Sequence, residues 1–219
     1  MSAEPNKLGR PQLVDRAKIL EAAIAIGLDN LSMHKVARYL NVSATSLYRY
    51  VDSKDALMQA CMDEFCSRIS QPNQDLRWDE YLSALSDSFN EALMATPGAH
   101  AYGTQLGPTT AAAYAIIDGA LSHLLSAGFS HRLALTAYNL IVDHAFVLAA
   151  KRERTLEVAD SQDQQGYQIL RETEHALAPY PALTATLAAV LPPDFNDTTA
   201  VDTIIEGIRV KLGEEQALG

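Results

Sequence analysis

The stretch between Val42 and Leu57 gathers side chains that suit contacts with phosphate oxygens and base edges. Within ten residues it offers two hydroxyls, a phenol, a guanidinium and an ammonium, at Thr45, Ser46, Tyr48, Arg49 and Lys54. Hydroxyls and phenols donate hydrogen bonds to phosphates, and a guanidinium can pair bidentately with a guanine. If one surface holds these groups together, the stretch predicts a contact with double-stranded DNA.

A helix that begins after Ser43 and runs to about Tyr50 would create such a surface. With Leu47 pointing inward and about 100° of rotation per residue, the small and apolar positions fall within about 60° of it. These inward positions are Ser43, Ala44, Tyr50 and Val51. The outward positions are Thr45, Ser46, Tyr48 and Arg49. Taken singly, a Thr-Ser pair near a helix start is usually capping and a surface arginine is usually solvated, so the prediction depends on their joint placement.

Two helix starts nearby can add phosphate contacts. The N–H groups at a helix N-terminus attract anions, and Lys54 begins the helix that follows the cap residue Ser53. Another helix begins with Ser32, Met33, His34 and Lys35.

Helical spacing dominates the rest of the chain. A first helix is expected from Pro11 to a C-terminal cap at Gly27, and the short second and third helices form a helix-turn-helix pattern. Further helices are expected at 76–95, 99–106, 109–127, 130–155, 163–178, 182–191 and 198–213. We therefore predict an all-α fold with a tail at 1–10, a head at 11–58 whose fourth helix continues to about 70, and a body at 75–219.

The charge of the chain is divided unevenly between these parts. The 219 residues carry a net charge of −10, but residues 1–54 hold 8 Lys/Arg against 5 Asp/Glu. Since phosphate attraction is screened within about 10 Å, a small basic head on an acidic body can still bind DNA.

The hydrophobic segment around Asp143 and His144 indicates a buried helix rather than a membrane span. The polar N-terminus and the two cysteines, Cys61 and Cys66, suit reduced thiols in the cytoplasm.

Sequence motifs for catalysis or metal binding are weaker than the DNA-binding pattern. Glu172 and His175 form half of a di-iron signature with no second copy, and no phosphate loop or nucleophile elbow is present. We predict no catalytic residues, metal or cofactor, and hence no enzyme. Asp143 and His144 are better explained as a core or interface pair than as a catalytic dyad.

A ligand pocket needs apolar walls with a few polar anchors. The candidates are Phe89, His100, Tyr102, Gln105, Tyr114, Tyr138, His144 and Phe146.

Residues 17–58, "AKILEAAIAIGLDNLSMHKVARYLNVSATSLYRYVDSKDALM", resemble the TetR family of transcriptional repressors. The stretches "WDEYLSALSDSFNEALMATPG", "LSHLLSAGFSHRLALTAYNLIVDHAF" and "TIIEGIRVKL" are similar to the C-terminal domain of its tetracycline-repressor subgroup. The resemblance implies a helix-turn-helix DNA-binding head on a larger helical ligand-binding and dimerisation domain. It implies a homodimer through helices at about 130–155 and 198–213.

The resemblance also implies roles for individual residues. Ser43–Tyr50 becomes the recognition helix, Lys54 a phosphate contact, and Met33 and His34 the backbone approach of the second helix. His100 stands one position from the subgroup's metal-binding histidine, and "KRER" replaces its acidic residues, so magnesium–tetracycline binding is not expected. We predict a repressor that binds a palindromic operator and is released by an unknown small molecule. An activator of the same fold, and a helical carrier or enzyme with a vestigial head, are the alternatives.

Overall fold

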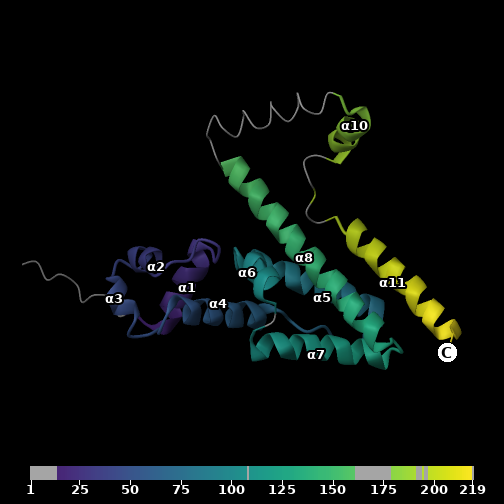
Figure 1. The fold of residues 1–219 in the computed structure, drawn as a ribbon, viewed down its shortest axis with the longest axis horizontal. Coiled ribbons are helices and arrows are strands. Elements are labelled where there is room, and N and C mark those ends of the chain that lie inside the picture. The colour runs from purple at the N-terminus through teal and green to yellow at the C-terminus, as the bar shows by residue number, and fades with distance from the viewer. Residues whose placement is uncertain (1–13, 108, 161–178, 191–193, 195–196, 219) are drawn as a thin grey trace, which may run out of the picture.

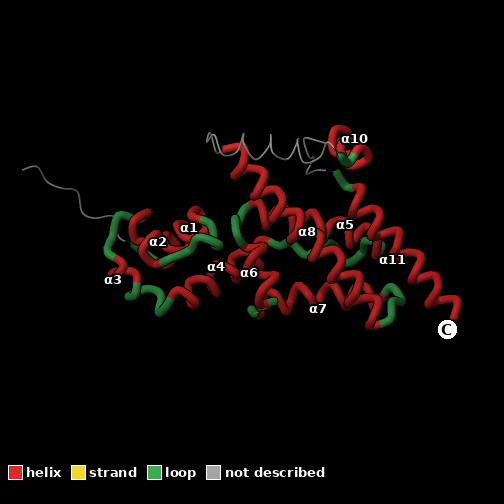
Figure 2. The backbone as a smooth tube through the Cα atoms, turned by 45° about the horizontal axis from the view of Figure 1, so that its top comes forward, coloured by secondary structure: helices red, strands yellow, loops and turns green. Residues whose placement is uncertain are grey.

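The computed structural model describes residues 14–107, 109–160, 179–190, 194 and 197–218, and every regular element among them is a helix (Figures 1 and 2). A small group of helices near the N-terminus, α1 to α4, forms the head. The other helices form the larger body, from which α8 and α11 extend as long rods. The prediction of an all-α fold with a head and a larger helical domain is confirmed.

The head consists of α1 (Arg16–Ile26), α2 (Met33–Tyr39), α3 (Ala44–Leu47) and the first turns of α4 (Lys54–Arg68). Its helix boundaries follow from capping side chains. Asp15 and the three expected serine caps each accept a hydrogen bond from a backbone N–H three residues ahead. The serine caps are Ser32, Ser43 and Ser53.

Two expected boundaries in the head need correction. The first helix begins at Arg16 with Asp15 as its cap, whereas Pro11 lies outside the described residues. The third helix ends at Leu47 rather than near Tyr50, and a turn continues the chain. Gly27 closes α1 as expected, with a φ of 89° that favours glycine.

The body consists of helices whose bounds lie close to the predicted ones. They are α5 (Trp78–Met94), α6 (Ala99–Leu106), α7 (Ala111–Ser126), α8 (His131–Asp160), α10 (Pro181–Val190) and α11 (Thr199–Leu218). Both long helices outrun their predicted C-terminal ends, because α8 continues to Asp160 and α11 to Leu218. The helix expected at 163–178, with Glu172 and His175, lies outside the described residues.

One apolar cluster joins the head to the body. It runs from Ile19 and Leu47 in the head through Phe65 on α4 to Tyr138 on α8, with all four side chains buried. A second cluster holds α11 against α5 and α8 through residues such as Leu82, Ile141 and Ile208. Burial at about 25 cal/mol per Å² of apolar surface stabilises both clusters. Because α4 belongs to the first cluster along its length, head and body share a continuous core.

A short turn between α5 and α6 forms a second contact between body and head. The carbonyl oxygen of Pro97 accepts a hydrogen bond from the Leu28 N–H at 2.9 Å. Gly98 follows with a φ of +80°, and a Cβ built there would lie 2.5 Å from the Asp29 nitrogen. Only glycine therefore fits this close approach of two backbones.

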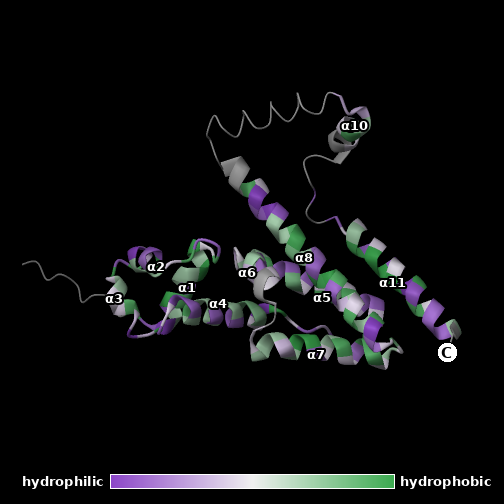
Figure 3. Cartoon of the chain, viewed as in Figure 1, coloured by the Kyte–Doolittle hydropathy of each residue, from purple (hydrophilic) through white to green (hydrophobic). Residues whose placement is uncertain are grey.

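Helix α8 combines a hydrophobic middle with a hydrophilic stretch nearer its C-terminus (Figure 3), where the sequence reads KRER at 151–154. By length and composition alone α8 could cross a membrane, because an 18-residue window within its segment His131–Leu156 has a mean hydropathy of 1.5. However, 44% of that window is buried inside the fold, a pattern that a core helix also produces. Its apolar residues on one side belong to the two buried clusters described above.

Candidate nucleic-acid interface and ligand cavity

Helix α3 and the turn that follows it place most of the predicted polar side chains in solvent. Leu47 is fully buried and Val51 is 5% exposed, whereas Tyr48 is 52% exposed and Thr45 and Arg49 are also exposed. The side chains of Thr45, Tyr48 and Arg49 have no hydrogen-bond partner within the described part of the chain. The three groups are thus available to an external partner.

Three side chains of this stretch differ from the predicted faces. Ser43 was expected to point inward but is exposed, because it precedes the helix as its cap. Tyr50 was expected to point inward but is 41% exposed, because the helix has already ended and the turn rotates its side chain outward. Ser46 was expected to face outward but is half-buried, and its hydroxyl lies 2.7 Å from the Ser43 hydroxyl. The Ser46 N–H also donates to Ser43 at 3.2 Å, so this pair caps the helix.

The start of α2 offers fewer side chains than predicted. Met33 is only 6% exposed and belongs to the apolar core, so its side chain cannot reach a phosphate in this conformation. His34 is exposed, and the hydroxyl of Ser32 accepts a hydrogen bond from the Lys35 N–H. The sequence could have predicted this burial, because Met33 is a hydrophobic residue in the first turn of a helix that packs against the core.

Lys54 and three aromatic or basic residues complete the surface of the head. Lys54 is exposed at the first position of α4. The sequence reasoning missed Arg38 and Tyr39 near the end of α2, which are both exposed, Tyr39 by 61%. Exposed tyrosines beside basic residues are typical of nucleic-acid contacts. Tyr39 at the end of α2 and Tyr50 in the turn before α4 could therefore have been recognised by their place in the helix-turn-helix region.

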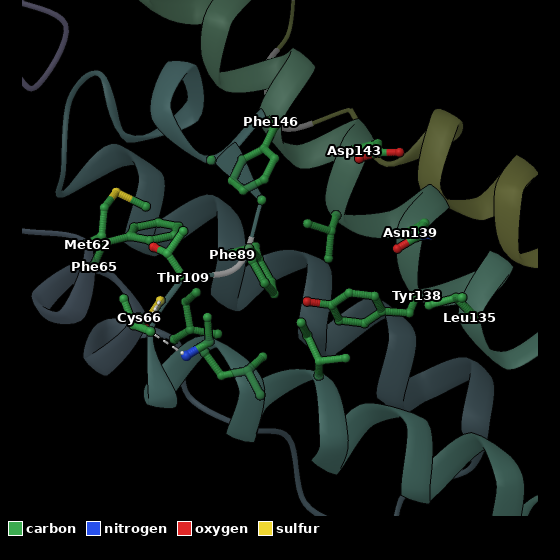
Figure 4. Close-up of a pocket in the computed structure, with 18 residues that line it drawn as sticks. Met62, Phe65, Cys66, Phe89, Thr109, Leu135, Tyr138, Asn139, Asp143 and Phe146 are labelled. Atoms are coloured by element: carbon green, nitrogen blue, oxygen red, sulfur yellow. Dashed lines mark hydrogen bonds between the residues drawn. The ribbon is translucent and has the colours of Figure 1, made fainter. Parts of the chain in front are cut away.

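The body contains an apolar cavity between five helices, with a volume of about 290 Å³ (Figure 4). Helix α8 contributes Tyr138 and Phe146 to its wall, and α5 contributes Phe89, as the sequence predicted. The sequence reasoning missed the wall that α4 supplies. This wall comprises Met62, Phe65, Cys66 and Ile69. Their helical spacing on an apolar face was visible, but it equally fitted ordinary core packing.

The other predicted ligand residues are not among those that line this cavity. Tyr114 is 57% exposed on α7, and Tyr102 packs half-buried against the apolar cluster. His144 lies on another side of α8, in a polar hollow bounded by α5 and α11. His144 points away from the cavity because consecutive side chains on a helix differ in direction by about 100°, and His144 directly follows the lining residue Asp143. The side chain of Gln105 lies outside the described residues.

His100 lies beside the turn that contacts the head, rather than in the cavity. Its Nδ1 atom is 3.4 Å from the Glu153 Oε1 atom but forms no hydrogen bond. The same carboxylate oxygen accepts a hydrogen bond from the Gly98 N–H at 3.1 Å. Glu153 of α8 therefore holds the turn that carries Pro97 against the head.

Burial favours the neutral forms of two groups in the cavity wall, the Cys66 thiol and the Tyr138 phenol. It raises the pKa of the Cys66 thiol, although a hydrogen bond from the Thr110 hydroxyl lowers it in part. Burial likewise raises the pKa of the Tyr138 phenol, with further contributions from Cys66, Tyr81 and Asp143. Within the described part of the chain, no group of three or more His, Cys, Asp or Glu residues could hold a metal ion.

Two family profiles cover most of the chain. The profile "Bacterial regulatory proteins, tetR family" matches residues 13–61, and "Tetracyclin repressor-like, C-terminal domain" matches residues 71–212. The curated tetracycline repressor protein class C of Escherichia coli is 30% identical over 164 residues, which are 72% of this chain and 71% of that protein. The chain belongs to the TetR family of transcriptional regulators, with a C-terminal domain of the tetracycline-repressor type.

Solved structures share the fold at low sequence identity. The apo form of ActR from Streptomyces coelicolor superposes with a TM-score of 0.69 at 19% identity, covering 94% of this chain and 99% of that one. The complex of ActR with actinorhodin gives a TM-score of 0.65 at 20% identity, covering 91% and 95%. The relatives matched here are transcriptional regulators rather than enzymes.

Proposed function

We propose that this protein is a homodimeric repressor that binds a palindromic operator through α3 and is released by a small molecule. The observation that carries the proposal is the exposed face of Thr45, Tyr48 and Arg49 over the buried Leu47. Each head would place α3 in a major groove, and a two-fold dimer would span half-sites about 34–36 Å apart. Lys54, Ser32 and His34 would contact the flanking phosphates.

Exposed apolar residues on the two long helices support the dimer. On α8, Leu140 and Val147 are 44% and 51% exposed. They are seven residues apart and therefore lie on the same face of the helix. On α11, Val210 is 54% exposed, and a Cβ added to Gly207 would meet no atom within 4 Å. Small and apolar residues permit close helix packing, so α8 and α11 of two copies would bury this surface together.

The cavity supports control by a small molecule, because its walls belong to helices that hold the head. Helix α4 lines the cavity and also begins beside α3 in the head. Helices α6 and α8 line it as well, through Gly103 and Phe146, and Glu153 of α8 binds the turn at Gly98. A coupling of about 1–3 kcal/mol between cavity and head would weaken operator binding by about 5–150-fold.

A cytoplasmic location, where the chromosome is accessible, follows from this function. An activator would use the same head and cavity, and a reporter gene in a deletion strain separates it from a repressor. The other alternative is a carrier or enzyme with a vestigial head. It predicts no operator binding at any salt concentration.

The direct test is a gel shift with the DNA that flanks the protein's own coding region, at stated salt concentrations. Arg49→Ala should weaken binding by about 1–3 kcal/mol, or roughly 5–150-fold, if the guanidinium contacts a base. Arg132→Ala is the matched control, since it removes one positive charge from the exposed start of α8. Equal affinities of the wild type and Arg49→Ala would show that the assigned face of α3 is wrong.

A further inference from the structure

The cavity is small and walled mainly by hydrocarbon. Its volume of about 290 Å³ lies near the lower end of ligand pockets, which span roughly 300–1,000 Å³. Three phenylalanines from α4, α5 and α8 meet in its wall, Phe65, Phe89 and Phe146, with ring centroids 6.2–6.5 Å apart. Such rings pack well against a flat aromatic molecule, and their faces also attract cations.

The described residues that line the cavity offer no positive charge to an anion. None of them is lysine, arginine or histidine, and the one carboxylate is Asp143, which is exposed at the rim of the wall that α8 forms. An ionised ligand group that enters an apolar site without an opposite charge loses its hydration without replacement. A negatively charged ligand would meet this cost and the repulsion of Asp143 as well.

Neutral hydrogen-bonding groups are present in the wall. The hydroxyl of Tyr138 is directed into the cavity (Figure 4) and has no hydrogen-bond partner among the described residues. Thr109 and Asn139 add a hydroxyl and an amide close to the rim. These groups can orient an uncharged oxygen or nitrogen of a ligand without requiring a charge on it.

We infer that the effector of this cavity is a lipophilic aromatic compound that is neutral or positively charged, and that anions of the same size are rejected. This inference rests on the proposed function, because it names the ligand class of the same regulatory cavity. The three phenylalanines select for aromatic character, and the arrangement of Asp143 and the uncharged anchors selects against negative charge.

Three anthracene derivatives on one skeleton test the inference with the full-length protein. Anthracenylmethylamine is a cation near neutral pH, anthracenylmethanol is neutral, and anthracenecarboxylate is an anion. Fluorescence titration should show that the amine and the alcohol bind at least about tenfold more tightly than the carboxylate. Equal or tighter binding of the carboxylate would overturn the inference, and so would the absence of binding by all three.

Matched variants connect the selectivity to this cavity. Asp143→Asn should weaken binding of the amine by a few fold and leave the alcohol unchanged, because an exposed carboxylate contributes modestly. Asp118→Asn, which removes an exposed charge from α7 outside the cavity, should change neither. A loss of amine affinity in both variants would assign the effect to overall charge and overturn the role of Asp143.

A variant that fills the cavity shows whether the probes bind inside it. Ala113→Phe, or the smaller Ala113→Leu if the first fails to fold, should weaken binding of amine and alcohol alike. Unchanged binding would place the probes elsewhere and overturn the inference. Operator affinity measured without any probe separates the two proposals. Normal operator binding with the wrong probe selectivity refutes only the ligand class, whereas failure to bind operator refutes the proposed function itself.

Discussion

The head and the body use their polar side chains in opposite ways. On the head, Tyr48 is 52% exposed and Arg49 is exposed, and neither side chain has a hydrogen-bond partner within the described residues. In the body, Asp79 and His123 are buried, and the His123 ring stacks on Tyr81 with centroids 4.0 Å apart. The head therefore presents its polar groups to a partner outside the chain, whereas the body uses its polar groups between helices.

This difference indicates what a substitution should do in each part. A polar side chain on the surface of the head contributes to binding and little to stability. A buried polar side chain that is hydrogen-bonded, such as Asp79 in the body, contributes to stability, because removal of one partner leaves the other unsatisfied. The apolar residues beneath both parts belong to a shared cluster, so they should affect the whole molecule.

The largest effect is expected for Leu47→Ala, which tests whether the head shares the core of the body. Leu47 is fully buried beneath α3, so the substitution should lower the free energy of unfolding by about 2–5 kcal/mol. Operator affinity should fall as well, because α3 loses its support. Urea denaturation should show one transition for the whole chain, and Leu183→Ala, at an exposed position of α10, should be nearly neutral.

The next effect concerns the turn at which the two parts meet. In Gly98→Ala the new methyl group would lie 2.5 Å from the Asp29 nitrogen, in a backbone conformation that already disfavours alanine. We expect a loss of at least about 1–3 kcal/mol of unfolding free energy. Gly213→Ala on α11, where a Cβ meets no atom within 4 Å, is the control. Equal unfolding curves for the two variants would contradict the close contact.

A third prediction concerns the buried carboxylate of Asp79, which accepts hydrogen bonds from Arg77 and Arg209. Partial burial raises the pKa of Asp79, but the hydrogen bond from Arg209 and the backbone N–H groups outweigh it, so the pKa is lowered overall. The stability that the ionised Asp79 carboxylate contributes is therefore complete above the ordinary carboxyl pKa of about 4. It is lost as the pH falls through the lowered pKa of Asp79 in the folded protein.

Asp79→Asn should accordingly cost about 1–3 kcal/mol at neutral pH and less in acid. Urea denaturation at pH values from about 7 down to 3 measures the difference, and the two curves should converge as Asp79 becomes protonated. Asp87→Asn, at an exposed position of the same helix, provides the comparison. A cost that does not depend on pH would mean that the charge of Asp79 is not the source of the stability.

The smallest effect should come from Tyr48→Phe, which removes one exposed hydroxyl from the head. The loss of one hydrogen bond to a phosphate should weaken operator binding by about 0.5–1.5 kcal/mol. Unfolding should be unchanged within about 0.5 kcal/mol, as for Tyr180→Phe before α10. A measurable loss of stability with no change in operator affinity would reverse the distinction between head and body.

Sequence reasoning succeeded where structure depends on neighbouring residues. Ser32, Ser43 and Ser53 cap the helices that were expected to follow them, because a serine hydroxyl bonds a backbone N–H only three residues away. Helical spacing also predicted the elements of the body, with boundaries that differ by a few residues for most of them. It overextended α3, since nothing local to Tyr48 signals that the helix stops there.

The cavity could be predicted only in part, because it depends on how several helices rotate against each other. Phe89, Tyr138 and Phe146 were recognised as aromatic residues of apolar helices, and they line it. Tyr114 met the same criterion but is exposed, while the adjacent Ala113 lines the wall. A rotation of about 100° between neighbours decides between these outcomes, and the sequence does not reveal it.

Under the proposed function, helix α4 would act as a lever, because its two ends lie in different parts of the protein. Its 15 residues span about 22 Å at 1.5 Å per residue, from Lys54 beside α3 to Cys66 and Arg68 at the cavity end. A tilt of about 5° at the cavity end would displace Lys54 by about 2 Å. Packing changes too small to alter the fold of the body would thus become a displacement of the head comparable to the length of a hydrogen bond.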